Sequence, residues 1–506
     1  MGIVTDIYEI RWAVASAIIA LYVIVKIRAY RRLSAFDGPF SVGFSNFLFS
    51  KALINFNFHL WHKDVIDKHG PIARIGPNDL ITNSPELLAH MSAVRSPYTR
   101  TKWFNRATRL WPGKDHIFSL LDEEEHLARR QQMAPGYSGK ENLSLESSID
   151  VHIQELVELI RSKYLSTDKE TKPMDFAKKV QYLTLDVISN VGFGKPFGDV
   201  KADEDLNEYL EAGETGLAVV SVGAALGLTW LLQWSPLAKI MGPSEKDLVG
   251  FGRMLATARE LVHDRLKRDT SGKSDMFASF VRHGLDTDQL VSESVLQVVA
   301  GSDTTATALR CIFLYLMTHP RVYAKLQAEI DTVSRTSASG IISDADARKL
   351  PYMQAVIKEG MRVHPPVTTT IGKRVPDGGD TVVVNGKQVF LPGGVNVSQA
   401  TLAVQHNKDI FGDDVADFRP ERWLLEKDEK RLAEMNRANE LIFGYGRYQC
   451  LGKSIAMMEI GKTVFELMKS FDWCLARPEK PWKEKNFFGI FTQTDMLVLI
   501  TERERK

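Results

Sequence analysis

The stretch FGYGRYQCLGKS, residues 443–454, holds three glycines, a Gly-Lys-Ser run and one cysteine. A phosphate-binding Walker loop needs four residues between its first glycine and the Gly-Lys-Ser, whereas Gly446 and Gly452 enclose five. The dinucleotide-binding fingerprint fails as well, because its third glycine would fall at Gln449. The stretch must therefore be explained by its cysteine, Cys450.

Cys450 precedes a stretch of helical period, so we expect its sulfur near a helix amino terminus, where the dipole and free amides favour the thiolate. Such a thiolate is either a nucleophile or an axial ligand to haem iron. A nucleophile needs a base in reach, and no Cys/His signature stands out in the sequence. Taken alone, the loop also fits a glycine-rich turn with an incidental cysteine.

The other two cysteines, Cys311 and Cys474, lie in apolar settings typical of free core cysteines. An odd number without a CxxC pair argues against a disulfide framework and a structural zinc site, and favours a reducing compartment. The 506 residues are 44% hydrophobic and 25% charged, as in ordinary globular proteins. The formal net charge of +1 disfavours nucleic acid as a partner.

The amino-terminal run 12–25 is uncharged and apolar, and a basic cluster follows it at 26–32. As a helix the run rises only ~21 Å, short of a ~30 Å hydrocarbon core. A cleaved secretory signal starts with basic residues, but here Asp6 and Glu9 precede the apolar run. We therefore predict an uncleaved membrane anchor at 1–28, with the body in the cytosol because the basic cluster lies on its carboxyl side.

Residues 29–45 contain Gly38, Pro39 and Gly43, which break helix and strand and predict a hinge to the membrane. Segments 72–82 and 380–390 read as a pair of short strands and a β-hairpin around Asn385-Gly386. Between about 144 and 365, long segments of helical period dominate. The second apolar run, 217–234, is interpreted as a core helix or an apolar surface on the bilayer rather than a second span.

Two charged pairs have helical spacing. Glu359 and Arg362 are three apart on a helix that must end near Pro365, so they can pair. In isolation such a pair is usually a solvated contact of ~0.2–0.5 kcal/mol. His126 and Arg130 are four apart in a stretch whose composition favours a charged, solvated helix face.

The stretch AGSDTTAT, residues 300–307, places polar residues inside an apolar pattern. It reads either as a helix start capped by Ser302 or Asp303, or as the middle of one long helix. The apolar positions keep one helical phase across it, which favours the long helix. Mid-helix threonine and serine can bond the carbonyl of the preceding turn, bend the axis and open a groove.

Phe443, Gly446, Cys450 and Gly452 match, in order and spacing, the FxxGxxxCxG ligand loop of the cytochrome P-450 superfamily, the haem-thiolate monooxygenases. The chain resembles this family from end to end. The resemblance implies a mainly α fold with small β-sheets and a single catalytic domain at 46–506. It also implies haem b (iron protoporphyrin IX) as cofactor, with Cys450 as the axial iron ligand.

The same resemblance assigns roles to the other motifs. It implies that Asp303 and Thr304 are the acid and the hydroxyl that deliver protons in oxygen activation, which favours a monooxygenase over the isomerases and dehydratases of this fold. It implies that Glu359, Arg362 and Arg422 form a buried structural triad that braces the ligand loop.

Haem propionates are expected at His126, Arg130 and Arg374. Two residues before the cysteine, where the family usually has Arg or His, this chain has Tyr448, so that contact is open, and Arg447 is its possible substitute. Substrate contacts are expected from five mostly apolar segments, which suit a hydrophobic substrate: 103–121, 217–234, the helix around Ala300, 367–370 and 487–491.

The sequence contains no flavin or nicotinamide fingerprint, so electrons are expected from a separate NADPH-dependent flavoprotein reductase in the endoplasmic reticulum membrane. The segments 70–82 and 443–453 look most like the fungal branch that includes pisatin demethylase. That likeness implies tailoring of a secondary metabolite by hydroxylation, epoxidation or oxidative demethylation. The alternatives are a haem-thiolate isomerase or dehydratase that does not use dioxygen, and a non-catalytic membrane haem or lipid carrier.

Overall fold

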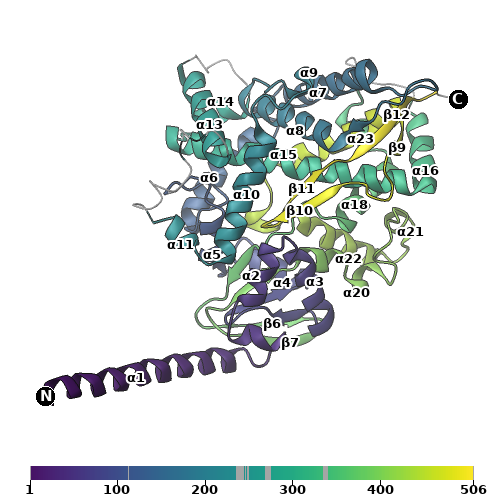
Figure 1. Cartoon of the computed structure of the whole chain (residues 1–506). Helices are drawn as coiled ribbons and strands as arrows, with labels where there is room; N and C mark the ends of the chain where they lie inside the picture. Colours follow the sequence, from purple (N-terminus) through teal and green to yellow (C-terminus); the bar gives the residue numbers. More distant parts are fainter. Residues whose placement is uncertain are drawn as a thin grey trace.

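The computed structural model describes residues 2–111, 113–234, 244, 247, 250–267, 275–333 and 340–504. Helices predominate, and small sheets lie at one end and along one side of the body (Figure 1). The α-helices are α1 Gly2–Arg32, α2 Phe47–Ile54, α3 Phe58–His69, α4 Pro85–Ser92, α5 Lys102–Ala107, α6 Glu123–Tyr137, α7 Leu145–Leu159, α8 Phe176–Phe193, α9 Asp199–Ala202, α10 Tyr209–Ala225, α11 Thr229–Leu232, α13 Gly250–Lys267, α14 Met276–Arg282, α15 Thr287–Thr318, α16 Pro320–Asp331, α17 Asp344–Ala347, α18 Pro351–Val363, α19 Thr401–Gln405, α20 Lys408–Phe411, α21 Arg422–Leu425, α22 Glu429–Glu440 and α23 Lys453–Ser470.

The strands form four small sheets. They are β1 Ile72–Arg74, β2 Asp79–Thr82, β3 Thr99–Arg100, β4 Met174–Asp175, β5 Gly372–Arg374, β6 Asp380–Val384, β7 Lys387–Leu391, β8 Asn396–Gln399, β9 Phe471–Leu475, β10 Lys483–Phe487, β11 Ile490–Thr494 and β12 Leu497–Glu502. The largest sheet has the order β1-β2-β8-β5-β3, and the others are β4-β12-β9, β10-β11 and β6-β7. The two strand pairs predicted at 72–82 and 380–390 are confirmed.

Helix α15 runs through the middle of the body and packs against α8, α13, α18 and α23 (Figure 1). It begins with a capping box: the Asp286 side chain accepts from the Gln289 backbone amide, and the Gln289 side chain accepts from the Asp286 backbone amide. It continues without a break through Asp303, so the prediction of one long helix is confirmed and the alternative of a helix start at Ser302 or Asp303 is wrong. The main apolar core surrounds this helix, where α7, α8, α15 and α23 meet.

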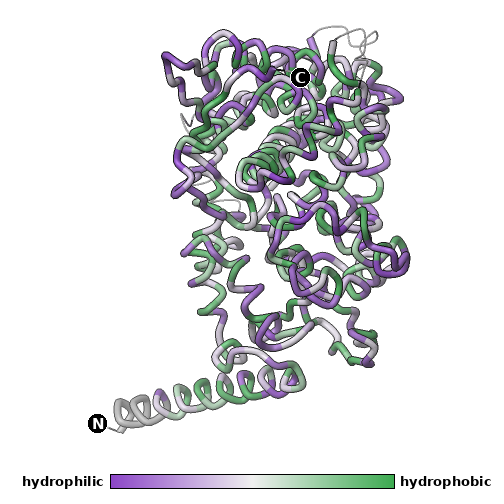
Figure 2. Tube along the Cα trace, turned by 90° about the vertical axis from the view of Figure 1, so that its right-hand side faces the viewer, coloured by the Kyte–Doolittle hydropathy of each residue, from purple (hydrophilic) through white to green (hydrophobic). Residues whose placement is uncertain are grey.

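Helix α1 projects from the body (Figure 1), and its central part is hydrophobic (Figure 2). The stretch Arg11–Arg32, 22 residues, is long and apolar enough to cross a membrane, and among the described residues it is the one helix that meets this test. It rises ~33 Å as a helix, which is longer than the uncharged run alone. The second apolar run is divided between α10 and α11, with Gly227 at φ +70° between them.

The segment predicted as a hinge, 29–45, is fastened to the body. The buried guanidinium of Arg74 donates hydrogen bonds to the carbonyls of Ala29, Tyr30 and Gly43 at 3.0–3.3 Å. A side chain at Gly43 would collide with the Tyr30 ring, which stacks on Phe44. In this structure the end of α1 and the strand β1 therefore form a joint held by these hydrogen bonds.

Candidate active site

Two 3₁₀ turns, Leu441–Phe443 and Gly446–Tyr448, precede Cys450, and α23 begins three residues after it. The fold of this loop depends on glycine at two positions: Gly444 has φ +73° and Gly446 has φ +59°, and a Cβ at Gly446 would clash with the Ser92 carbonyl. The Cys450 amide donates to the Phe443 carbonyl at 2.7 Å, which closes the loop. The spacing of Phe443, Gly446 and Cys450 thus has a direct backbone cause.

The Cys450 side chain is open on one side and otherwise surrounded by protein, and this desolvation raises the pKa of its thiol. The backbone amides of Gly452 and Lys453 and the charge of Arg130 act in the opposite direction and favour the thiolate. Arg130 donates to the carbonyl of Gln449 at 2.7 Å, so it supports the loop from α6. A metal ion bound to the sulfur would complete the deprotonation.

A cluster of cations lies beside this loop. Arg100 Nε and Nη2, Lys373 Nζ and Arg447 Nε are buried and make no hydrogen bond within the described residues. Burial, and after it the positive charges of this cluster and of Arg130, lower the pKa of His126 to about 3, so its imidazole is neutral. Burial and the nearby Arg100 lower the pKa of Lys373 as well. Glu123 is the anion among them, with an oxygen 3.7 Å from Arg447 Nε.

This cation cluster fits haem b. Buried donors without acceptors are costly, and a ligand that carries two carboxylates would satisfy them and offset their charge. Arg100, Lys373 and Arg447 would hold the propionates, and Cys450 would supply the axial ligand. The residues present are thus those that a haem-thiolate site needs.

The residues predicted to bind the haem propionates do not all lie in the cation cluster. The His126 ring lies 5.3 Å from the Tyr448 ring at a tilt of 34°, and the Tyr448 hydroxyl donates to Glu123 at 2.5 Å. Arg374 does not join the cluster: it pairs with Asp377 and is half exposed. The alternation of β5 turns Lys373 inward and Arg374 outward.

Sequence reasoning missed Arg100 and Lys373. Arg100 lies on the two-residue strand β3, where it pairs with Lys373 of the antiparallel strand β5. No short motif contains either residue. The available signal was the strand alternation around 372–374, in which the residue next to Arg374 faces the opposite side.

Lys373→Met should weaken haem binding and at the same time stabilise the haem-free protein. In the haem-free state Lys373 is desolvated and repelled by Arg100, and in the loaded state it gains a carboxylate worth about 1.5–3 kcal/mol. Haem affinity should fall about 10- to 100-fold, while the thermal midpoint of the haem-free protein should rise. Haem titration and thermal unfolding of both states check the two signs.

The matched control is Arg374→Met, which removes the neighbouring cation on the solvent side of the same strand. Its haem affinity should match that of the parent protein. A larger loss in Arg374→Met than in Lys373→Met would restore the motif-based assignment.

Asp303 and Thr304 lie on α15, which packs against α23, the helix that follows Cys450. The Thr304 hydroxyl donates to the Ala300 carbonyl at 2.8 Å, and Ser302 bonds Val298 in the same way. Burial raises the pKa of Asp303 to about 6, against the opposing effect of Arg310 and two hydrogen bonds. The carboxyl is therefore able to gain or lose a proton near neutral pH.

Glu359, Arg362 and Arg422 form one fully buried cluster. Both Glu359 oxygens accept from Arg362 at 2.9 Å, and one also accepts from Arg422 Nε at 2.8 Å. Trp423 Nε1 donates to the other Glu359 oxygen at 2.9 Å. The structure thus brings together the three residues of the predicted triad.

The segments expected to contact substrate converge. Phe104 stacks on Phe488 at 5.5 Å, and both share one apolar cluster with Ala224 and Ala225 of α10. Val367 forms a bridge with Ile490. The predicted segments 103–121 and 217–234 therefore share a mainly apolar contact with 487–491, which also contacts 367–370.

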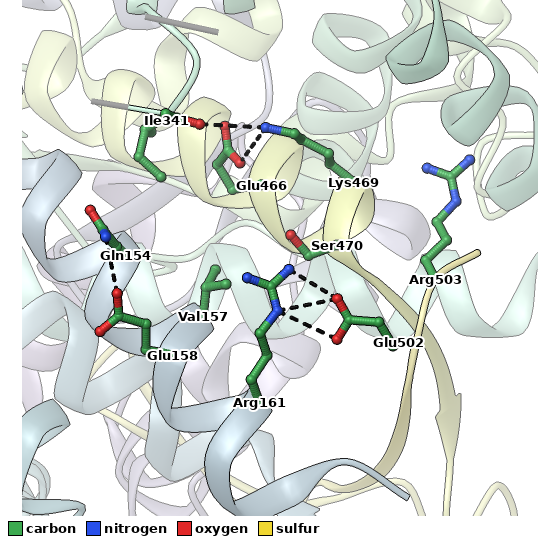
Figure 3. Close-up of a pocket in the computed structure, with 11 residues that line it drawn as sticks. Gln154, Val157, Glu158, Arg161, Ile341, Glu466, Lys469, Ser470, Glu502 and Arg503 are labelled. Carbon is green, nitrogen blue, oxygen red and sulfur yellow. Dashed lines mark hydrogen bonds and ion pairs between the residues drawn. The ribbon is translucent and has the colours of Figure 1, made fainter. Parts of the chain in front are cut away.

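A polar surface groove of about 400 Å³ lies far from this site (Figure 3). It is formed by α7, the last residues of α23 and the end of β12, whereas Cys450 precedes the first residue of α23. The length of α23 alone separates them by ~27 Å. Charges in the groove pair with one another or with neighbours, as Arg161 does with Glu502 and Arg503 with Asp331.

Comparisons with known proteins agree with this geometry. The sequence model of the family Cytochrome P450 matches residues 44–500. Cytochrome P450 monooxygenase ABA1 of Pyricularia oryzae is 41% identical over 485 residues, which cover 94% of this chain and 93% of that protein. Cytochrome P450 monooxygenase aba1 of Botryotinia fuckeliana is 37% identical over 87% of this chain and 86% of its own length.

Pisatin demethylase of Fusarium vanettenii is a more distant relative, 29% identical over 90% of this chain and 88% of its own length. The chain belongs to the cytochrome P450 family. The predicted fold, the haem-thiolate cofactor and the monooxygenase class are thereby confirmed, and so is the likeness to fungal members. The enzyme requires electrons from a redox partner and acts on a hydrophobic substrate.

Proposed function

We propose that this enzyme inserts one atom of dioxygen into a hydrophobic small molecule of fungal secondary metabolism, by hydroxylation, epoxidation or oxidative demethylation. The observation that carries the proposal is the intact acid and hydroxyl pair, Asp303 and Thr304, on an unbroken α15 that packs against the helix after Cys450. An isomerase or dehydratase has no need of such a pair. The fungal relatives and the apolar segments around Phe104 and Phe488 support the substrate class.

When bound, haem ligated by the Cys450 thiolate supplies the oxidising chemistry. The protein's own groups do the rest. Asp303, with its pKa near 6, takes up and releases a proton, and the Thr304 hydroxyl one residue on passes it toward the reacting centre. The aromatic cluster at Phe104 and Phe488 excludes water from the substrate.

We also propose the setting of this reaction. Helix α1 anchors the enzyme in the endoplasmic reticulum membrane with the catalytic domain, 46–506, in the cytosol. Basic residues on the carboxyl side of the apolar stretch support this orientation. Val219, Leu226, Trp230 and Trp234 are exposed on the α10–α11 segment and would rest on the same bilayer. Electrons would come from an NADPH-dependent flavoprotein reductase in that membrane.

Thr304→Ala should leave haem content unchanged but divert reducing equivalents to hydrogen peroxide. The variant keeps the helix and loses the hydroxyl that passes the proton, so product formed per NADPH should fall about tenfold or more. The measurement compares NADPH, oxygen, product and peroxide for a hydrophobic substrate chosen by the shift that it causes in the haem spectrum. Product without equivalent consumption of NADPH and oxygen would contradict the monooxygenase proposal.

Thr318→Ala is the matched control. The Thr318 hydroxyl donates to the Leu314 carbonyl just as the Thr304 hydroxyl donates to the Ala300 carbonyl, and it lies on the same helix but 14 residues away. The Thr318→Ala variant should turn over with parental coupling. Equal coupling in Thr304→Ala and Thr318→Ala would remove Thr304 from the proton path.

A further inference from the structure

The Asp303 carboxylate is held from two other helices. Its Oδ1 accepts from Gln181 Nε2 of α8 at 2.8 Å, and its Oδ2 accepts from the Tyr209 hydroxyl of α10 at 3.3 Å. Gln181 is almost fully buried, and so is Tyr209. The carboxyl is therefore fixed by donors that sequence motifs did not identify.

The amide of Gln181 can point in only one direction. Arg310 Nη2 donates to Gln181 Oε1 at 2.7 Å, and the same guanidinium donates through Nε and Nη2 to the Ala177 carbonyl. Arginine has donors and no acceptor, so the oxygen of Gln181 must face it. The NH₂ group of Gln181 is then left to face Asp303, about two turns of α15 before Arg310.

We propose that Arg310 and Gln181 are positioning residues for the proton-delivering acid: Arg310 orients the Gln181 amide, and the oriented N–H holds the Asp303 carboxyl and favours its ionised form. This inference rests on the proposed function of Asp303. Arg310, Gln181 and Asp303 form one directed chain of hydrogen bonds between α15 and α8, in which Arg310 and Gln181 are buried and Asp303 is half-buried.

The charges around Asp303 set the sign of the effect. Burial raises its pKa, and Arg310, Gln181 and Tyr209 lower it, in that order. Arg310 is the charged group on its own helix, α8 presents the neutral Gln181, and α10 presents Tyr209. Two further acids act on these neighbours rather than on Asp303: the charge of Asp205 raises the pKa of Tyr209, and the charge of Asp175 raises the pKa of Arg310. Removal of the Gln181 donor therefore moves the balance toward the protonated acid.

The test is a pH titration of the Asp303 carboxyl in the haem-loaded enzyme by infrared difference spectroscopy, with Asp303→Asn to identify its band. Gln181→Met should raise the midpoint by about one to two pH units, the equivalent of one hydrogen bond to a charged group. Gln181→Glu should raise it further, because it keeps an acceptor for Arg310, loses the donor and adds a second carboxylate. Arg310→Lys should stay closer to the parent than Arg310→Met.

Thr184→Val is the matched control, since Thr184 is buried on the same helix and bonds the Gln181 carbonyl without touching Asp303. Its midpoint should equal that of the parent. Because the protonated acid supplies the proton, product formed per NADPH should decline as pH rises through the midpoint, and this decline should move to higher pH in the Gln181 variants.

The outcomes separate the two claims. A midpoint unchanged in both Gln181→Met and Gln181→Glu, each with normal haem content, overturns the positioning role. If only one of the two Gln181 variants binds haem, the Asp303 titration midpoint of that variant alone decides whether Gln181 has the positioning role. If Asp303→Asn retains parental coupling, the proposed function of Asp303 fails, whereas an upward shift of the Asp303 band in the Gln181 variants would still establish the positioning effect.

Discussion

Cys450→Ala is expected to abolish the thiolate-type absorption band of the reduced carbon monoxide complex, and NADPH-supported oxygenation with it. Alanine offers no ligand atom. The other two cysteines are displaced from the site, Cys311 buried within α15 and Cys474 exposed on β9. The buried cations Arg100 and Lys373 remain, so some haem should still bind, but without its sulfur ligand. The carbon monoxide difference spectrum of variant and parent, at equal haem content, measures the effect.

Cys474→Ala is the control, because it removes a sulfur without altering the loop around Gly446. Its difference spectrum should match that of the parent. A thiolate-type band that survives in Cys450→Ala would assign the ligand to another residue. A parent protein whose difference spectrum indicates a nitrogen ligand would overturn the haem-thiolate reading altogether.

The features that could be predicted from sequence are those determined within a few residues. The Cys450 loop is one, because the geometry of Gly446 and the Phe443–Cys450 bond are local consequences of the spacing. The unbroken α15 is another, since its apolar residues keep a single helical phase across the polar patch at 300–307. The turn at Asn385-Gly386 likewise follows from residues that accept positive φ.

The features that could not be predicted depend on contacts between distant segments. Lys373 and Arg374 are adjacent and both basic, and only the register of β5 decides which one faces the haem site. Arg100 reaches the same site from a strand hundreds of residues before Cys450. The joint at 29–45 is similar: Gly38 and Pro39 are typical of a hinge, but the side chain that ties the segment belongs to Arg74.

The second large effect is expected at the triad. Glu359→Gln should reduce the recovery of folded, haem-loaded enzyme severely, because it removes the carboxylate that two buried guanidinium groups, Arg362 and Arg422, share. Arg422 keeps its pair with Asp414 at 3.1 Å, but Arg362 has no other carboxylate partner in the part of the chain that the structure describes. An uncompensated buried charge costs about 3–5 kcal/mol, and the whole stability of a domain is about 5–15 kcal/mol. Thermal unfolding and the yield of haem-loaded protein measure the loss.

A carboxylate whose partner cations are exposed provides the control for this substitution. Glu421 pairs with Arg321 and Lys325, whose side chains are 61% and 49% exposed. Water can replace the carboxylate at these two exposed cations, so Glu421→Gln should cost less stability than Glu359→Gln. Equal losses in the two variants would show that Glu359 is no more than an ordinary ion pair.

The triad reaches the haem-ligand loop through backbone carbonyls. Arg362 Nη1 donates to the carbonyls of Gln405 and Val415, and Arg422 Nη1 donates to that of Phe411, so one carboxylate fixes the path of the chain between α19 and α21. That chain continues through α22 directly into the loop of Cys450. If the triad braces the loop, Glu359→Gln protein that does fold should bind haem more weakly and lose its thiolate-type band more readily on warming than the Glu421→Gln control. A band as persistent as that of the control would limit Glu359 to overall stability.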